Sequence, residues 1–229
     1  MRSDPGRLSP ISAFFARVGD LMLLNLLFIA GCLPVFSAGA SASAMFYVTL
    51  KLHRKQDTNI VKDFFHSWRQ NLWQGFILEL ITLAVAAVLI IDIYVLVHLM
   101  DSDGFFKVLA VLWAVVALRL LAMWIYIFPL LAQFDHGIST FINSARIMSR
   151  RHLSHTVAIM LLTAFPVMLG AVIPYALEWE IFLFVLFGFS LVAHVCTGFY
   201  AAVFDQYISS DKNKAPTAVG EGAVVSSDL

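Results

Sequence analysis

The sequence predicts an all-α polytopic membrane protein with six transmembrane helices arranged as three hairpins, the first of them short. The chain of 229 residues is 60% hydrophobic and only 13% charged, whereas soluble domains carry about a quarter charged residues. It contains apolar runs long enough to cross a bilayer, and its basic residues fall in alternate connections between those runs. Because the formal net charge is zero, no overall field attracts nucleic acid, and no nucleic-acid partner is expected.

The apolar runs define the candidate crossings, since a transmembrane helix needs about 20 apolar residues. Four segments reach this length: Phe76–Met100, Val108–Gln133, Thr156–Leu177 and Ile181–Phe204. Leu21–Phe36 is a shorter fifth candidate, which Ile11–Phe15 extends on the N-terminal side. Ala38–Leu50 is only marginally long enough, and it could instead be a re-entrant or surface segment.

The positions of lysine and arginine decide between these alternatives, because basic residues accumulate in short cytoplasmic loops. If Ala38–Leu50 crosses, 13 of the 15 basic residues lie in the cytoplasm, with Lys107 outside and Arg119 within a span. If it does not cross, 10 of them lie outside. Six crossings with both termini in the cytoplasm are therefore predicted.

The chain is expected to form a single domain with two loose ends. Residues 11–208 make up the transmembrane domain, and residues 1–10 form a flexible N-terminus. Residues 209–229 lack aromatic side chains and any apolar period. They are expected to form a disordered cytoplasmic tail.

Two cytoplasmic connectors between the hairpins have the pattern of amphipathic helices. In the first, apolar residues recur every four positions, and Gly75 is expected to end the helix; these residues are Ile60, Phe64, Trp68, Leu72 and Phe76. In the second, the apolar side consists of Ile138, Phe141, Ile142 and Ala145. The interfacial basic residues are Arg69 in the first connector and Arg146, Arg150 and Arg151 in the second.

Two placements of these connectors remain open. They could lie in the inner interface of the lipid bilayer, with the aromatic side down and the basic side towards anionic headgroups. They could equally pack on the cytoplasmic ends of the helix bundle.

Four ionisable residues fall within the predicted spans: Glu79, Asp92, Arg119 and His194. Ionisable groups are costly in a membrane and are functional candidates. One hypothesis is a polar pocket or relay at mid-membrane, built from Arg119, His194 and one of the acids. The alternative, which we favour, is that a neighbouring carboxylate neutralises Arg119 and the pair holds helices together, while Glu79 reaches the inner surface.

The stretch between the first two spans, AGCLPVFSAGASASAMFYV from residue 30 to 48, is predicted to be the outer turn of the first hairpin. Pro34 ends the first helix. Small residues follow, and they allow two helices to pack closely; they are Ser37, Gly39, Ser41 and Ser43. Ile29–Cys32 also has the form of a lipobox, but the long charged leader and the five other spans argue against lipidation of Cys32.

The patterns of catalytic sites are missing from the sequence. It contains no Gly-rich phosphate loop, no zinc pattern, and no Ser, His and acid set that any spacing brings together. His152 and His155 are three residues apart, but they follow two arginines and form a solvated basic face in our interpretation. No enzymatic activity, metal or cofactor is expected.

Scattered short motifs resemble the YesL-like family of bacterial membrane proteins, a domain of unknown function. The motifs are Asn25, Leu33-Pro34, Phe36, Gly39, Ala44 and Tyr47, then Phe64-Phe65-x-Ser67-Trp68-x-x-Asn71, then Phe128 to Phe134 and Asn143-Ser144-Ala145. The resemblance covers residues 14–207, and its matching Pro34, Gly39 and Pro129 are positions that shape helices. Ser37 stands where a threonine is expected.

The resemblance implies a protein of the bacterial cytoplasmic membrane without an established activity. Such proteins are often encoded beside sugar-uptake ABC transporters and glycan-degrading enzymes. This implies a non-enzymatic accessory or assembly factor, with the lipid bilayer and sugar ABC transporter subunits as partners.

The alternative is a transport permease or small-molecule carrier. An ABC permease would carry a Glu-Ala-Ala loop followed by Gly, whereas the second connector offers Ser144-Ala145-Arg146. A carrier more often has matching helix breaks in two halves. Pro166, Gly170 and Pro174 break the fifth span, but the third has no counterpart.

Overall fold

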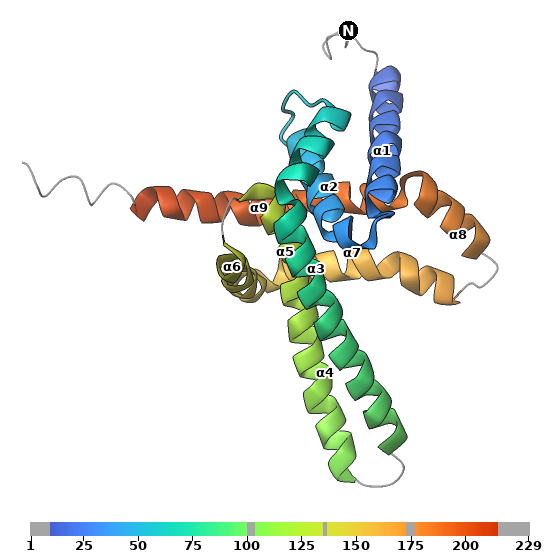
Figure 1. Cartoon of the computed structure of the whole chain (residues 1–229), viewed down its shortest axis with the longest axis vertical. Coiled ribbons are helices and arrows are strands. Elements are labelled where there is room, and N and C mark those ends of the chain that lie inside the picture. The colour runs from blue at the N-terminus through green and yellow to red at the C-terminus, as the bar shows by residue number, and fades with distance from the viewer. Residues whose placement is uncertain (1–9, 100–103, 135–136, 173–176, 215–229) are drawn as a thin grey trace, which may run out of the picture.

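The computed structural model describes residues 10–99, 104–134, 137–172 and 177–214, and every regular element within them is helical (Figure 1). The elements are α1 (Pro10–Cys32), the 3₁₀ turn η2 (Val35–Ser37), α2 (Ala38–His53), α3 (Ile60–Leu99), α4 (Gly104–Trp124), α5 (Ile127–Gln133), α6 (Ile138–Arg151), α7 (Leu153–Val172), α8 (Leu177–Leu183), the π-helix η4 (Phe184–Gly188) and α9 (Phe189–Lys214).

Six helical stretches within the described residues are long and apolar enough to cross a membrane, which confirms the predicted all-α membrane protein. These stretches are Ile11–Cys32, Val35–His53, Ile60–Val95, Ala110–Gln133, Leu153–Gly170 and Ile181–Tyr207. The marginal segment after Pro34 is among them. It is by far the most enclosed of the six, which explains why it can be rich in glycine, alanine and serine: its neighbours are helices rather than lipid.

α3 differs from the prediction, because the first connector is not a separate helix. It runs unbroken through Gly75 for 40 residues, about 60 Å at 1.5 Å per residue and roughly twice the hydrocarbon thickness of a bilayer. Its first half lies against α2 and its second half against α4 (Figure 1). α2 and α4 therefore lie at different levels along the same helix.

The first half of α3 packs antiparallel to α2 along the whole of α2. At one end, the Lys51 ammonium and the Asp63 carboxylate form an ion pair at 2.9 Å. Further along, the Asn71 side-chain amide donates to the Ser43 hydroxyl at 3.3 Å. The apolar face of the predicted first connector is thus covered by protein, with Phe64 buried between helices.

Glycines set the distance between α2 and α3 at the other end of the pair. A Cβ atom at Gly39 would lie 2.5 Å from the Gly75 carbonyl oxygen, and a Cβ at Gly75 would lie 2.6 Å from the Ala40 nitrogen. Any larger residue at either position would push the two backbones apart. Gly75 therefore permits a close helix contact rather than ending a helix.

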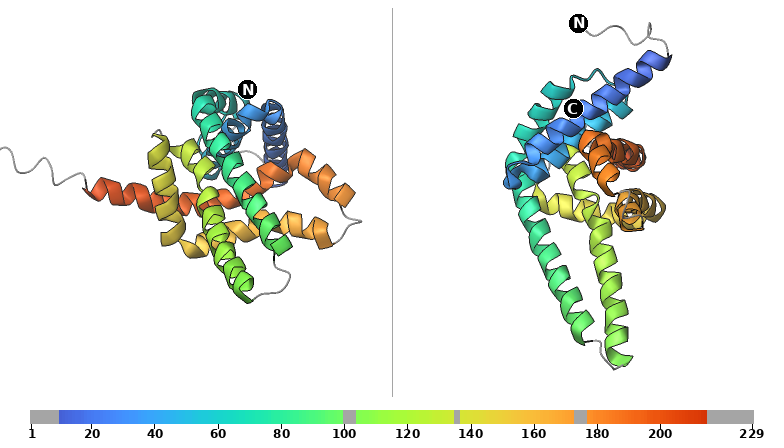
Figure 2. Two further views of the ribbon diagram at one scale, coloured as in Figure 1. Left: turned by 60° about the horizontal axis from the view of Figure 1, so that its bottom comes forward. Right: turned by 90° about the vertical axis from the view of Figure 1, so that its right-hand side faces the viewer.

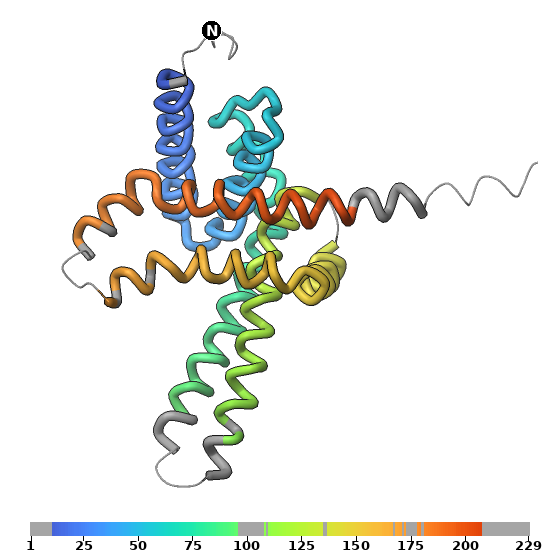
Figure 3. The backbone as a smooth tube through the Cα atoms, turned by 180° about the vertical axis from the view of Figure 1, so that it is seen from behind, coloured from blue at the N-terminus to red at the C-terminus, as the bar shows by residue number. Residues whose placement is uncertain are grey.

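α7 and α9 lie side by side and run across α2 and α3 rather than along them (Figures 1 and 3). In the right-hand view of Figure 2 they are seen nearly end on, while α3 and α4 run down the page. The three predicted hairpins therefore do not stand parallel in one bundle. The second half of α3 and α4 instead form an arm that projects from the rest of the molecule.

Two predicted spans are interrupted in the structure. Val108–Gln133 divides into α4 and α5 at Ile125 and Tyr126, and Ile181–Phe204 contains the π-helix between α8 and α9. α9 extends to Lys214, so the predicted start of the tail at residue 209 falls inside a helix. Residues 1–9 and 215–229, predicted to be flexible, lie outside the described residues.

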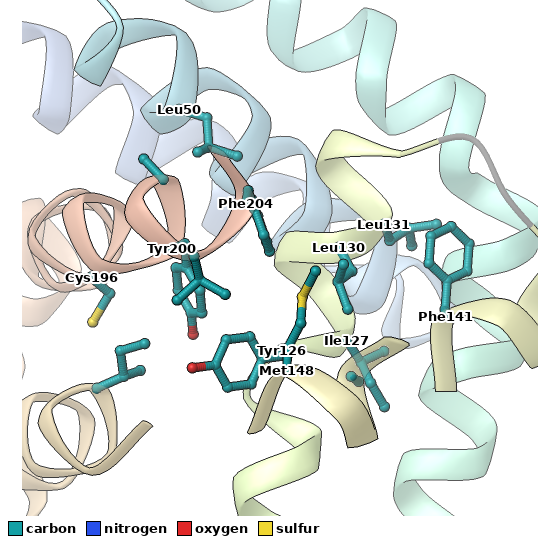
Figure 4. Packing of buried hydrophobic residues seen from close by; sticks show 14 of the residues in the cluster. Leu50, Tyr126, Ile127, Leu130, Leu131, Phe141, Met148, Cys196, Tyr200 and Phe204 are labelled. Atoms are coloured by element: carbon teal, nitrogen blue, oxygen red, sulfur yellow. The ribbon is translucent and has the colours of Figure 1, made fainter. Parts of the chain in front are cut away.

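The main core lies where α5, α6 and α9 meet (Figure 4). Tyr126 and Tyr200 pack edge to face at its centre, with ring centroids 5.5 Å apart. From α6, the second predicted connector, Phe141, Ala145 and Met148 are buried in this cluster. The apolar side of the second connector therefore packs against other helices of the protein.

Candidate functional site

The four ionisable residues of the predicted polar pocket lie in three different surroundings. Among the described residues, none of them forms a hydrogen bond or an ion pair with another of the four. The structure therefore does not assemble Arg119, His194, Asp92 and Glu79 into a pocket or relay.

Glu79 lies at the N-terminus of α2. Its carboxylate Oε2 accepts a hydrogen bond from the Gly39 backbone N–H at 3.0 Å. The first N–H groups of a helix lack partners within the helix, and the helix dipole favours a negative charge there. Glu79 therefore stabilises the start of α2 and ties it to the middle of α3.

Arg119 and Asp92 lie on the projecting arm. Arg119 is exposed on α4 and Asp92 is half-buried on α3, within two of the stretches apolar enough to cross a membrane. Neither has an ion pair or hydrogen bond with any described residue. The predicted neutralisation of Arg119 by a neighbouring carboxylate within the chain is therefore not seen.

His194 lies beside basic side chains rather than beside an acid. The side chains of Arg17 in α1 and His53 in α2 lie near the His194 ring. The Nδ1 atom of His194 is buried and has no hydrogen-bond partner. The pocket hypothesis places His194 beside Arg119 at mid-membrane, but His194 faces the end of α2, because α9 crosses α2.

A polar contact that the sequence did not predict joins α1 to the π-helix. The Asn25 side-chain amide donates to the carbonyl oxygens of Phe184 and Val185, at 2.9 and 2.7 Å. Its Oδ1 atom accepts from the Ser190 N–H at 3.0 Å, and the Ser190 hydroxyl donates to the Leu21 carbonyl at 2.7 Å. Asn25 is fully buried and satisfies backbone groups at the π-helix, an element that often occurs at functional sites.

The helix-shaping prolines lie at two breaks in the chain. Pro34 separates the end of α1 from η2 and has an extended backbone. Pro129 lies in the first turn of α5, just after the break at Ile125 and Tyr126. A proline lacks the N–H that would bond to the carbonyl four residues earlier, which explains the break before Pro129.

The basic residues of the connectors are on the surface. Arg69, Arg146, Arg150 and Arg151 are all exposed, and the Arg146 guanidinium donates to the Asn143 side-chain carbonyl at 3.0 Å. Another arginine organises the end of α2: Arg54 donates to Gln133 of α5 at 3.0 Å and to the Asp205 carboxylate of α9 at 2.9 Å.

An open groove of about 560 Å³ lies between α1 and the start of α3. Its lining includes Asp20, Asp57 and Asp63, together with Lys62. Within the described ranges, no group of three or more His, Cys, Asp and Glu residues could hold a metal ion.

Residues 21–93 match the model of a family described as a protein of unknown function, DUF624. YesL-like proteins belong to this family, so the resemblance is confirmed over this part of the chain. The matched part contains Asn25, the packed pair of α2 and α3, Glu79 and Asp92, but neither Arg119 nor His194. No curated protein and no solved structure matches the chain.

Proposed function

We propose that this chain, which carries the family match in its first three long helices, is an accessory or assembly factor of a carbohydrate-importing ABC transporter. In this proposal it has no enzymatic activity of its own. It lies in the bacterial cytoplasmic membrane, with both termini in the cytoplasm. The frequent gene neighbourhood of YesL-like proteins with sugar-uptake ABC transporters supports the link to carbohydrate import.

The observation that carries the proposal is the exposed Arg119 on the arm of α3 and α4. The arm presents long apolar faces on both helices, including Ile90, Tyr94, Val111 and Val115. Arg119 interrupts the face of α4 and has no partner among the described residues. A charged side chain within a membrane is costly, and it is usually paired or faces the interior of a bundle.

A second membrane protein packed on the arm would meet both needs. Its transmembrane helices would cover the apolar faces by close packing, which drives helix association in lipid. An acidic side chain on such a helix would neutralise Arg119. The expected partner is therefore a permease subunit that places a carboxylate at the depth of Arg119.

Site-specific crosslinking in native membranes tests this contact. A photoreactive amino acid at Val115, one turn before Arg119 on the same face of α4, should crosslink to a permease subunit of a sugar transporter. The matched control is Leu161, which is 64% exposed on α7 rather than on α3 or α4.

Charge dependence makes the test specific. Arg119→Gln should lower the crosslinking yield at Val115 several-fold, whereas Arg150→Gln on the exposed face of α6 should leave it unchanged. Equal permease yields at Val115 and Leu161, or a yield at Val115 that ignores Arg119→Gln, would contradict the proposal.

The interruption of the last long helix favours one other function, that of a carrier. Carriers use broken helices to build binding sites at mid-membrane, and η4 breaks the helix between α8 and α9. The Asn25 side chain already bonds to the backbone there, which leaves it little capacity for a substrate. Sugar uptake by proteoliposomes that contain only this protein would support a carrier and argue against an accessory role.

A further inference from the structure

The geometry points to a binding site for a phosphate-bearing anion, of the kind carried by anionic lipid headgroups, formed by Arg17, His53 and His194. These residues, here called the cationic cluster, come from α1, α2 and α9 respectively. Neither the carbohydrate link nor the family match assigns a role to them.

Two backbone relationships bring the three side chains together. The Leu21 carbonyl of α1 accepts from the Ser190 hydroxyl of α9 at 2.7 Å. Arg17 lies one turn before Leu21, and His194 lies one turn after Ser190. Because side chains four residues apart share a helix face, this contact brings Arg17 near His194.

His53 approaches the same face of α9 from the end of α2. Its Cε1 atom is 3.6 Å from the position that a Cβ atom at Gly198 would occupy. Gly198 lies one turn after His194, so the glycine leaves room for the imidazole of His53 beside His194. Three helices thus bring one permanent positive charge and two imidazoles to one place.

The cationic cluster has no acidic partner among the described residues. None of its three members forms an ion pair or hydrogen bond with another side chain there, and the buried Nδ1 atom of His194 is unsatisfied. A buried polar atom without a partner is unfavourable. A bound anion with several acceptor oxygens would accept a hydrogen bond from Nδ1–H and pair with the Arg17 guanidinium.

The charged neighbours of the cationic cluster face other partners. Lys51 is paired with Asp63 at 2.9 Å, and Arg54 is paired with Asp205 at the same distance. Asp20, the nearest acid to Arg17 along α1, lines the groove formed with residues 57–63. The Arg17 guanidinium therefore forms no ion pair with a carboxylate of the described residues.

The position of the cationic cluster suits a lipid headgroup. His53 is the last residue of α2 and is exposed, and Arg17 is half-buried near the start of α1. In the proposed topology both residues lie at the cytoplasmic surface of the membrane, where anionic phospholipids are concentrated. The ligand would reach the cluster from the side of His53 and place its phosphate between Arg17 and His194.

Lipid binding to the purified full-length chain tests the site. The probes are phosphatidylglycerol, which is anionic, phosphatidylcholine, which is zwitterionic, and inorganic phosphate, each measured by native mass spectrometry from a neutral detergent. Phosphatidylglycerol should bind more tightly than phosphatidylcholine. Arg17→Gln should weaken its binding about tenfold, the effect of losing one charge-assisted hydrogen bond.

Two further variants keep the test decisive. His53→Gln changes an exposed residue, so it should fold even if Arg17→Gln does not, and it should also weaken phosphatidylglycerol binding several-fold. Arg150→Gln removes the same charge from a distant exposed surface and should leave binding unchanged.

The outcomes separate the sources of the anion. Competition by excess inorganic phosphate, with the same dependence on Arg17 and His53, would keep the site and assign it to a free anion. Unchanged phosphatidylglycerol binding in both variants, or an equal loss in Arg150→Gln, would overturn the proposal. The measurement uses the isolated protein, so it does not depend on a transporter partner.

Discussion

The Tyr200 hydroxyl donates a hydrogen bond to the Ile125 carbonyl oxygen at 2.9 Å and so replaces a bond that Pro129 cannot make. In an α-helix the N–H of residue 129 would bond to this carbonyl, but proline has no N–H. The next residue in the chain restores the pattern, since the Leu130 N–H donates to the Tyr126 carbonyl at 3.0 Å. Tyr200, from α9, thus satisfies the one carbonyl that Pro129 leaves open.

This relationship predicts coupling between Tyr200 and Pro129. Tyr200→Phe should lower the free energy of unfolding by about 1 kcal/mol, because it leaves the Ile125 carbonyl unsatisfied in the core. In a Pro129→Ala background the new N–H can bond to Ile125, so the same substitution should cost much less. Unfolding in a mild detergent measures all four proteins of this double-mutant cycle. Additive effects would show that Pro129 and the Tyr200 hydroxyl are independent.

Asn25 should be one of the least replaceable residues, because its side chain meets three backbone groups at the π-helix. Asn25→Asp has nearly the same shape but cannot donate to Phe184 and Val185. It should lower the free energy of unfolding by about 2 kcal/mol or more, and Asn25→Leu should lower it further. Asn143 offers a control, since it is exposed and its side-chain carbonyl accepts a hydrogen bond from Arg146 at the surface. Asn143→Ala should change stability by less than about 0.5 kcal/mol.

The helix content could be predicted from the sequence because it depends on local properties. Apolar runs of sufficient length and the distribution of lysine and arginine are enough to predict six crossings. The match of residues 21–93 to a family also followed from motifs within that region. None of these inferences needs to know which helices are neighbours.

The incorrect predictions share one physical cause. The role of an apolar face or of a glycine in a helix depends on which other helix packs against it, and the sequence does not show this. A period of four from Ile60 to Phe76 predicts an apolar face, but it does not say whether lipid or α2 covers that face. Glycine weakens helices, and Gly75 was therefore interpreted as a helix end. In the structure it allows the Ala40 backbone to approach, a reason that becomes visible only when α2 is in place.

The candidate site was less predictable for the same reason. The mid-membrane hypothesis places His194 beside Arg119, whereas in the structure α9, which carries His194, crosses α2 (Figure 3). The role of Asn25 depends on a π-helix some 159 residues further along the chain, and no pattern around residue 184 predicts a π-helix. Glu79 was recognised as unusual, but its partner is a backbone N–H rather than a charged side chain.

The contact between α2 and α3 predicts opposite effects for two glycine substitutions. Gly75→Ala should lower the free energy of unfolding by about 1 to 3 kcal/mol, because the new methyl group overlaps the Ala40 backbone, which cannot rotate away. Gly19→Ala in α1 meets nothing within 4 Å and should raise stability by about 0.5 to 1 kcal/mol, since alanine favours the helix. If both substitutions stabilise the protein, α2 and α3 do not pack as closely as described.

Glu79 provides a test between a structural and a relay function. If it stabilises the N-terminus of α2, Glu79→Ala should lower the free energy of unfolding by about 1 kcal/mol. Glu79→Gln should cost less, because the amide oxygen still accepts from Gly39. A proton relay would behave differently: Glu79→Gln would abolish a transport or coupling activity and leave the unfolding midpoint unchanged.

The length of α3 makes the position of the first hairpin in the membrane a separate question, and labelling of single cysteines answers it. Six crossings with cytoplasmic termini place the turn between α1 and α2 outside. Val35 in this turn is 72% exposed, so Val35→Cys, in a chain whose Cys32 is replaced by alanine, should react with an impermeant maleimide added to intact cells. Ser37 is unsuitable, because it is buried and its hydroxyl donates to the carbonyl of Gly31 at 2.6 Å. Lys55→Cys, in the loop between α2 and α3, should react only after the cells are opened.

The alternative arrangement places α1 and α2 on the cytoplasmic side of the membrane, beside the first half of α3, which is possible because α3 is about twice as long as a bilayer is thick. Both cysteines would then react only in opened cells, and the six-crossing topology would be wrong.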